Sequence, residues 1–467
     1  MNKSLLTALS GIGLFLAGCS LTPQFQQPET PVPTQWPTGP AYQAPSPHAV
    51  AASELKWREF FIDERLQKLI ETALQNNRDL RLAALNVERA RAMYGIQRAE
   101  LYPSVGVQGA GGKQRQSIDL IQPGTARTRE QYSLDLGIAA WEIDFFGRIR
   151  SLSEQALEEY LATDEARRGA QIALVAEVAR AYLTLAADRE NLHLARSTLE
   201  TQQAAYALVQ KRFDVGVATE LDLKRAQIPL DTARGDLARY TQGVAQDKNA
   251  LDLLAGAPVP EEWLPPDLST VAPPREVAAG LSSELLLRRP DIMAAEHRLK
   301  GAYASIGAAR AALFPRISLT TSIGTASNQL SGLFDAGRDT WAFTPQLVMP
   351  IFDARVWAAL RVSKTDREII LTQYEKTIQT AFREVADALA VQGTIDEQVA
   401  AQQSLTAVLS DTYRLATQRY TKGIDSYLGV LDAQRAHFAA QQGLVSLRLA
   451  KLASQVRLYA VLGGGGE

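Results

Sequence analysis

Residues 206–227 read YALVQKRFDVGVATELDLKRAQ, and residues 413–434 read YRLATQRYTKGIDSYLGVLDAQ. The two stretches match at a constant offset of 207 residues. In the first, the matching residues are Arg212-Phe213, Gly216, Leu221 and Ala226-Gln227. Their equivalents in the second are Arg419-Tyr420, Gly423, Leu428 and Ala433-Gln434. A second match lies upstream, where residues 99–103 (AELYP) resemble residues 311–315 (AALFP). Self-similarity of this kind marks an internal repeat, so we infer two copies of one unit, residues 51–257 and 281–462.

Each copy contains a run typical of a very long helix. Residues 151–213 and 356–420 contain no proline and are rich in Ala, Leu, Glu, Gln and Arg. Some sixty helical residues span about 90 Å at ~1.5 Å each, and runs of that length are typical of coiled coils or helical repeats. A glycine follows each run, so we expect the chain to turn there and return antiparallel. The expected long helices are residues 150–213, 218–256, 354–421 and 426–462.

Two runs of alternating side chains precede the long helices in each copy. Apolar residues alternate with small or polar ones at Tyr132, Leu134, Leu136 and Ile138, at Ile317, Leu319 and Ile323, and at Trp341, Phe343, Leu347 and Met349. This pattern fits transmembrane strands, although a half-buried sheet of a soluble protein gives the same alternation. Strands are expected near residues 103–113, 131–142, 315–326 and 340–350. Four strands cannot close a barrel in lipid, whereas a symmetric oligomer can supply enough of them.

The N-terminus has the layout of a secretory signal peptide, residues 1–18, with Lys3 before an apolar run. The run ends in Leu16-Ala17-Gly18-Cys19, which resembles a bacterial lipobox, and Cys19 is the only cysteine of the chain. We expect Cys19 to carry a covalent lipid; a buried structural thiol is the alternative. In lipoproteins an Asp at the next place tends to retain the protein in the inner membrane, so Ser20 favours passage to the outer membrane.

Two proline-rich stretches and a glycine run divide the remaining chain. Eight prolines between residues 21 and 50 favour an extended tether without a core of its own, which we call the leash (residues 19–50). Residues 258–280 form a proline-rich seam between the copies, and residues 463–467 form a flexible tail.

Composition excludes several classes of function. With 49 basic and 51 acidic residues, the chain has no global field that attracts nucleic acid. No stretch after the N-terminus approaches the ~18 apolar residues of a spanning helix. The four histidines are scattered without metal-ligand spacing, and no phosphate-binding glycine loop follows a strand. We therefore predict that the protein is not an enzyme and needs no cofactor or metal.

Five short motifs carry a resemblance to a known family: residues 57–61 (WREFF), 74–80 (LQNNRDL), 141–148 (WEIDFFGR), 287–292 (LRRPDI) and 431–434 (LDAQ). With the repeat, they make the chain similar to the outer membrane factor family of the TolC and OprM type, nearest its OprM branch. The resemblance implies a mainly α fold with β: a homotrimer whose twelve strands, four per chain, form an outer-membrane β-barrel continuous with a twelve-helix periplasmic α-barrel. Residues 51–80, the seam and the chain end would form a belt around it.

The resemblance also implies a function and partners. Members are exit ducts of tripartite multidrug efflux systems, which dock to a periplasmic adaptor and to an inner-membrane pump of the resistance-nodulation-division class. The duct would catalyse no reaction and would let small amphipathic compounds pass to the outside.

The same resemblance assigns residues to a gated periplasmic aperture. The turn glycines Gly216 and Gly423 would mark that end. Leu428 and Asp432, four residues apart on one helix face, would form a Leu ring and an Asp ring in the trimer. Tyr420 and Asp222 occupy places that hydrogen-bond in TolC-like ducts. The chain departs from TolC at Asp425, where TolC has a locking Arg, and at Gly429, where it has an Asp; Arg419 is the expected substitute tether.

Two alternatives remain open on the sequence. A TolC-like duct for type I protein secretion differs from a drug duct only in its partners, although the lipobox favours efflux. A structural periplasmic coiled-coil lipoprotein would have the long helices without the four amphipathic strands.

Overall fold

The computed structural model describes residues 20–42, 50–51, 55–122, 124, 126–278 and 283–464. The signal peptide and Cys19 lie outside the described residues, as do parts of the leash and tail. The described chain is mainly helical with one four-stranded sheet, which confirms the predicted fold at that level. It forms two compact units. The first comprises Asn86–Thr163 and Ala294–Tyr374 with the N-terminal segment up to Glu29, and the second comprises Thr30–Leu85, Asp164–Met293 and Glu375–Glu467. Each unit therefore takes segments from both sequence copies.

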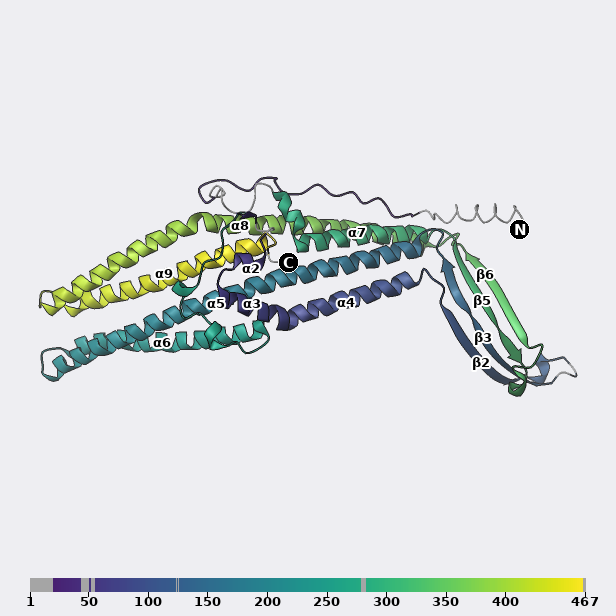
Figure 1. Cartoon of the computed structure of the whole chain (residues 1–467), viewed down its shortest axis with the longest axis horizontal. Helices are drawn as coiled ribbons and strands as arrows, with labels where there is room; N and C mark the ends of the chain where they lie inside the picture. The colour runs from purple at the N-terminus through teal and green to yellow at the C-terminus, as the bar shows by residue number, and fades with distance from the viewer. Residues whose placement is uncertain are drawn as a thin grey trace. The chain divides into compact units, whose positions relative to one another are not determined.

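The first unit contains the antiparallel sheet (Figure 1). Its strands, in the order β2-β3-β5-β6, are β2 (Val105–Arg115), β3 (Thr128–Ile143), β5 (Arg316–Ser327) and β6 (Asp339–Val348). Register places Val107, Leu136, Ile323 and Trp341 opposite one another across all four strands. Opposed residues share a face of a sheet, and these four are 45–78% exposed. One face of the sheet is thus apolar and is not covered by the described chain.

A β-bulge in β3 keeps this apolar face continuous. The register with β5 shifts between Ile138 and Trp141, where Ala140 has a φ of 49°. The amide of Ala140 donates a hydrogen bond of 3.1 Å to the hydroxyl of Thr320. The extra residue brings Trp141 opposite Leu319, on the same face as Ile138.

Four helices exceed thirty residues: α5 (Arg148–Asp214), α6 (Glu220–Ala255), α8 (Ala354–Thr421) and α9 (Tyr427–Val461). The shorter helices are α2 (Trp57–Phe60), α3 (Glu64–Asn76), α4 (Arg78–Ala99) and α7 (Pro290–Ala311). Two short strands, β1 (Val50–Ala51) and β4 (Val277–Ala278), pair in parallel. The described 3-10 helices are η2 (Ile118–Leu120), η3 (Glu261–Trp263), η4 (Leu268–Thr270), η5 (Ser283–Arg288) and η6 (Leu330–Gly332). In the second unit α6 returns beside α5 and α9 beside α8 (Figure 1).

One expectation about the helices was wrong. Among the described residues, α5 does contain an 18-residue window that is apolar enough, by length and composition, to cross a membrane. Of that window 56% is buried inside the chain. A core helix of a water-soluble bundle gives the same signal, because its apolar residues pack against neighbouring helices.

The core of the second unit gathers elements from both ends of the chain. The ring of Phe60 in α2 stacks on that of Tyr459 in α9 at 3.9 Å, with an interplanar angle of 10°. The hydroxyl of Tyr459 donates a hydrogen bond of 2.6 Å to the carbonyl of Leu55. Both aromatic side chains are fully buried. This cluster explains the WREFF motif as packing rather than as chemistry.

The described part of the leash is extended, and it contacts helices of both units. In the first unit Arg310 donates to the carbonyl of Leu21 at 3.1 Å, and the ring of Phe25 packs edge-on against Tyr303 at 5.6 Å. In the second unit Ser283 donates to the carbonyl of Pro33 at 2.6 Å. Its prolines favour an extended path that lies along helices instead of forming a core.

A carboxyl pair joins α5 to α6. Asp188 and Asp247 are partly buried near one another, and a Cβ on Gly243 would lie 2.7 Å from Oδ2 of Asp188. Burial, with the nearby charge of Asp188, raises the pKa of Asp247 to about 6, and burial raises the pKa of Asp188. Near that pH the folded state therefore binds more protons than the unfolded state, so stability rises as pH falls through 6.

We expect the purified native protein to melt at a higher temperature at pH about 5 than at pH about 7.5. In Asp247→Asn the contribution of this carboxyl to the difference between the two melting temperatures should be lost. The substitution is expected to raise the melting temperature at the higher pH, because it deletes the like charge beside Asp188. Asp231→Asn, on the exposed face of the same helix, is the matched control. An equal pH dependence in the native chain and in Asp247→Asn would contradict the assignment.

Candidate functional site

Both long hairpins close through the same turn, in the second unit. Gly216, between α5 and α6, has a φ of 77°, and Gly423, between α8 and α9, has a φ of 73°. The amides that close the turns reach carbonyls at matching places: Val217 to Arg212 at 2.8 Å, and Ile424 to Arg419 at 3.0 Å. This bond is that of a Schellman cap, which needs a left-handed residue and favours glycine. The turn chemistry therefore follows from the repeated glycine.

The expected tether residues have separate partners within the chain. Asp222 belongs to a capping box, where its carboxylate accepts from the backbone amide of Thr219 at 3.1 Å and from its hydroxyl at 2.7 Å. Arg419 donates to Asp425 of its own turn at 2.5 and 3.1 Å. The hydroxyl of Tyr420 accepts from the guanidinium of Arg212, on the other hairpin. Among the described residues, no hydrogen bond joins Tyr420 to Asp222.

The arginine partner of Tyr420 was missed by sequence reasoning. Arg212 and Arg419 are equivalent in the repeat, and either could have been solvated. The guanidinium carbon of Arg212 also lies 5.5 Å from the centre of the Tyr420 ring. The ring of Tyr427, at the start of α9 in the same hairpin as Tyr420, lies 5.0 Å from the Tyr420 ring, and burial raises the pKa of Tyr427 to about 12.

The two expected ring residues lie one helical turn apart near the start of α9. Leu428 is 47% exposed, and the side chain of Asp432 is 63% exposed with Arg435 at 4.0 Å. Their spacing of four residues puts them on one helix face. Other exposed apolar side chains gather at the hairpin ends: Val215, Val217, Leu221 and Ile424.

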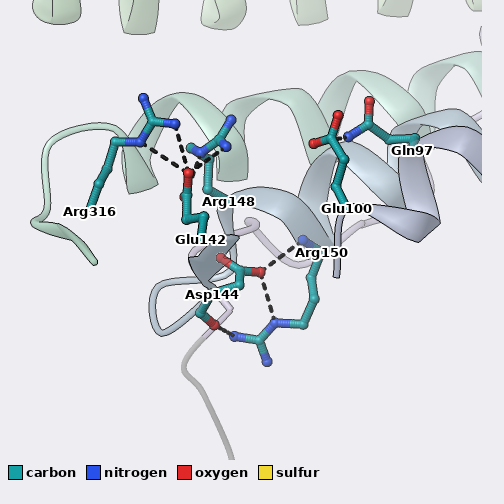
Figure 2. Close-up of polar contacts among 7 residues, drawn as sticks. All are labelled: Gln97, Glu100, Glu142, Asp144, Arg148, Arg150 and Arg316. Carbon is teal, nitrogen blue, oxygen red and sulfur yellow. Dashed lines mark hydrogen bonds and ion pairs between the residues drawn. The ribbon is translucent and has the colours of Figure 1, made fainter. Parts of the chain in front are cut away.

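The WEIDFFGR motif forms a polar bracket where β3 passes into α5 (Figure 2). The carboxylate of Glu142 accepts two hydrogen bonds of 2.8 Å from Arg148 and two, of 2.7 and 3.2 Å, from Arg316, which begins β5. The carboxylate of Asp144 accepts from the backbone amide of Arg150 at 2.9 Å and from its guanidinium at 3.3 Å. Glu142 is mostly buried there, with a side chain 13% exposed. The bracket therefore joins the first turn of α5 to the end of β3 and the start of β5, all within the first unit.

A second bracket, which the sequence did not assign, explains the LRRPDI motif. Arg289, with a side chain 11% exposed, donates to Asp291 at 2.8 Å and to Glu384 of α8 at 2.9 Å. Its other nitrogen donates to the carbonyl of Val461, at the end of α9, at 2.7 Å. One guanidinium thus connects α7, α8 and α9, because its planar fork presents several donors at once.

No group of three or more His, Cys, Asp or Glu residues among the described side chains is arranged to hold a metal ion.

Comparison with known proteins identifies the family. The model of the outer membrane efflux protein family matches residues 69–257 and 281–464. The antibiotic efflux pump outer membrane protein ArpC and the toluene efflux pump outer membrane protein TtgC, both of Pseudomonas putida, are each 50% identical, over 100% of this chain and 96% of theirs. The open-state outer membrane channel MtrE of Neisseria gonorrhoeae is 37% identical with a TM-score of 0.86, over 96% of this chain and 99% of that one.

The family model covers both sequence copies, and the structural likeness extends over the sheet and the long hairpins together. The chain belongs to the outer membrane efflux protein family.

Proposed function

We propose that the chain is the outer-membrane exit duct of a tripartite multidrug efflux system and that it works as a homotrimer. The observation that carries this proposal is the four-stranded sheet with an uncovered apolar face. Within the described residues, β2 and β6 each pair on one side only. Such a sheet exposes apolar side chains and unpaired edges to water, which soluble proteins avoid.

Three copies remove both problems at once. If β6 of one copy pairs with β2 of the next, twelve strands form a closed barrel without edges, and the apolar row through Val107, Leu136, Ile323 and Trp341 faces lipid. Threefold symmetry likewise places twelve long helices in a periplasmic α-barrel. Cys19 would carry the covalent lipid, which adds a second membrane signal to the barrel.

The hairpin ends would form the periplasmic aperture. Leu428 and Asp432 would then become a Leu ring and an Asp ring, and Gly216 and Gly423 would mark the rim. Three carboxylates brought together repel one another and attract cations, while a Leu ring narrows and dewets the path. The exposed apolar side chains at the ends favour docking of a periplasmic adaptor, and an inner-membrane pump of the resistance-nodulation-division class would supply the energy.

Small amphipathic compounds are the proposed cargo, passing without chemical change. A relative named for antibiotic efflux, 50% identical, supports this class, and one named for toluene efflux, also 50% identical, supports small apolar cargo as well. The duct itself would perform no catalysis.

Planar-bilayer conductance of the purified protein tests the duct. We expect a trimer with small conductance, which Asp432→Ala raises because it removes the carboxylate ring that would hold cations in the path. Asp411→Ala, an exposed carboxylate on α8 paired with Arg414, is the matched control and should leave the conductance unchanged. No channel from confirmed, inserted trimers would overturn the proposal.

A further inference from the structure

The two hairpin ends are sequence copies, yet they make different contacts. Arg212 and Arg419 occupy equivalent places, and each carbonyl accepts the amide that closes its own turn. Their side chains nevertheless point to different partners. Arg419 stays within its own hairpin, whereas Arg212 reaches the other one.

Two differences between the copies explain this asymmetry. Asp425, which holds Arg419, corresponds at the offset of 207 residues to Ala218, so Arg212 has no carboxylate at that place in its own turn. Tyr420 corresponds to Phe213, so at this place the second hairpin has a ring hydroxyl and the first does not. Arg212 lacks a carboxylate at the place of Asp425, and Phe213 lacks the hydroxyl of Tyr420, so the arginine–tyrosine contact between the hairpins forms once and not twice.

The acceptor side is held in place from its own hairpin. The Tyr427 ring, which is at the start of α9, packs against the Tyr420 ring at 5.0 Å. The Arg212 guanidinium combines a hydrogen bond to the hydroxyl with a cation-to-ring distance of 5.5 Å. Both interactions are attractive, and only arginine supplies both a planar donor and a surface that stacks on an aromatic ring.

We propose that Arg212 is the positioning residue that ties the α5–α6 end to the α8–α9 end through Tyr420 and so favours the closed aperture. This inference rests on the proposed function for its effect on conduction. Asp222 and Arg419 do not share this role, because the capping box and Asp425 engage them within their own hairpins. The tie lies within one chain, so a trimer has three copies of it.

The first test compares conductance in planar bilayers for the native chain, Arg212→Gln, Tyr420→Phe and the double variant. Each single substitution is expected to raise the open-to-closed ratio by about threefold or more, because one net hydrogen bond per chain is lost. The open-to-closed ratio of the double variant should not exceed that of Arg212→Gln, because Arg212→Gln already removes the hydrogen bond and the ring contact, whereas Tyr420→Phe keeps the ring. Arg212→Lys should restore part of the closed state through its single charged donor.

Arg414→Gln, which removes an exposed i,i+3 pair on α8, is the matched control and should conduct like the native chain. An open-to-closed ratio of Arg212→Gln equal to that of the native chain would overturn the inference. The inference would also be overturned if Arg419→Gln or Asp222→Asn raised the open-to-closed ratio and Arg212→Gln did not, because Tyr420 would then have a different partner.

A second readout separates this inference from the proposed function. A melting-temperature cycle of Arg212→Gln and Tyr420→Phe measures the tie whether or not the protein conducts. Non-additive losses in a protein without channels would support the tie and overturn the duct. Additive losses of melting temperature in a protein that conducts would overturn the inference about Arg212 and would still support the proposed duct.

Discussion

Gly137→Val and Gly324→Val are each expected to abolish assembly of the sheet. Gly137 in β3 lies opposite Ser322 in β5, and a Cβ on it would lie 2.8 Å from the Cα of Ser322 and still closer to the carbonyl of Thr321. A Cβ on Gly324 would lie 2.8 Å from the Cα of Asp135 in β3 and closer to the carbonyl of Leu134. Real Cβ atoms do not approach backbone so closely, so β3 and β5 would have to separate.

The yield of membrane-inserted trimer, followed by its heat-dependent mobility on gels, measures this effect. Gly106→Val is the matched control in the same sheet, because nothing lies within 4 Å of a Cβ built there. We expect native yield from the control and almost none from the other two variants. Native yield from Gly137→Val would show that the strands do not approach each other as described.

Glu142→Ala is expected to give the second-largest loss, by releasing the bracket between β3 and α5. The substitution leaves Arg148, with a side chain 23% exposed, without its bidentate partner, and also frees Arg316. Hydrogen bonds between charged groups contribute roughly 1.5 to 3 kcal/mol each where water does not replace them. The free energy of unfolding should therefore fall by on the order of 3 kcal/mol, with a lower melting temperature.

Glu130→Ala provides a comparison within the same strand. Glu130 pairs with Lys113 at 2.5 Å, but the lysine side chain is 66% exposed, and exposed ion pairs contribute about 0 to 1 kcal/mol. Thermal melting of both variants should therefore show a clear loss for Glu142→Ala and little for Glu130→Ala. Equal losses would mean that burial of the bracket does not strengthen it.

Strong periodicity made the large elements predictable. Alternating side chains indicated the four strands, and proline-free runs indicated the long helices, because both patterns are local. The bulge at Ala140 was missed, although its signal is visible: apolar residues are even-numbered up to Ile138 and odd-numbered at Trp141 and Ile143. A change of parity within a strand is the mark of one inserted residue.

The contacts at the hairpin ends were less predictable. Glycine spacing located the turns, because the left-handed residue is a local requirement. The choice between Arg212 and Arg419 as the cross-hairpin donor depends on Ala218 and Asp425, which act only once the turns have formed. The docking of the leash was missed for a similar reason, since its partners lie far along the chain.

The efflux role itself is tested most directly in a bacterium from which this gene has been deleted. Accumulation and toxicity of amphipathic antibiotics and of toluene are measured in the deletion strain, with and without the native chain or Gly137→Val. We predict that deletion raises both accumulation and susceptibility, that the native chain restores export, and that Gly137→Val does not. Unchanged accumulation and susceptibility on deletion, in a strain that normally produces the protein and has no second duct, would contradict the account.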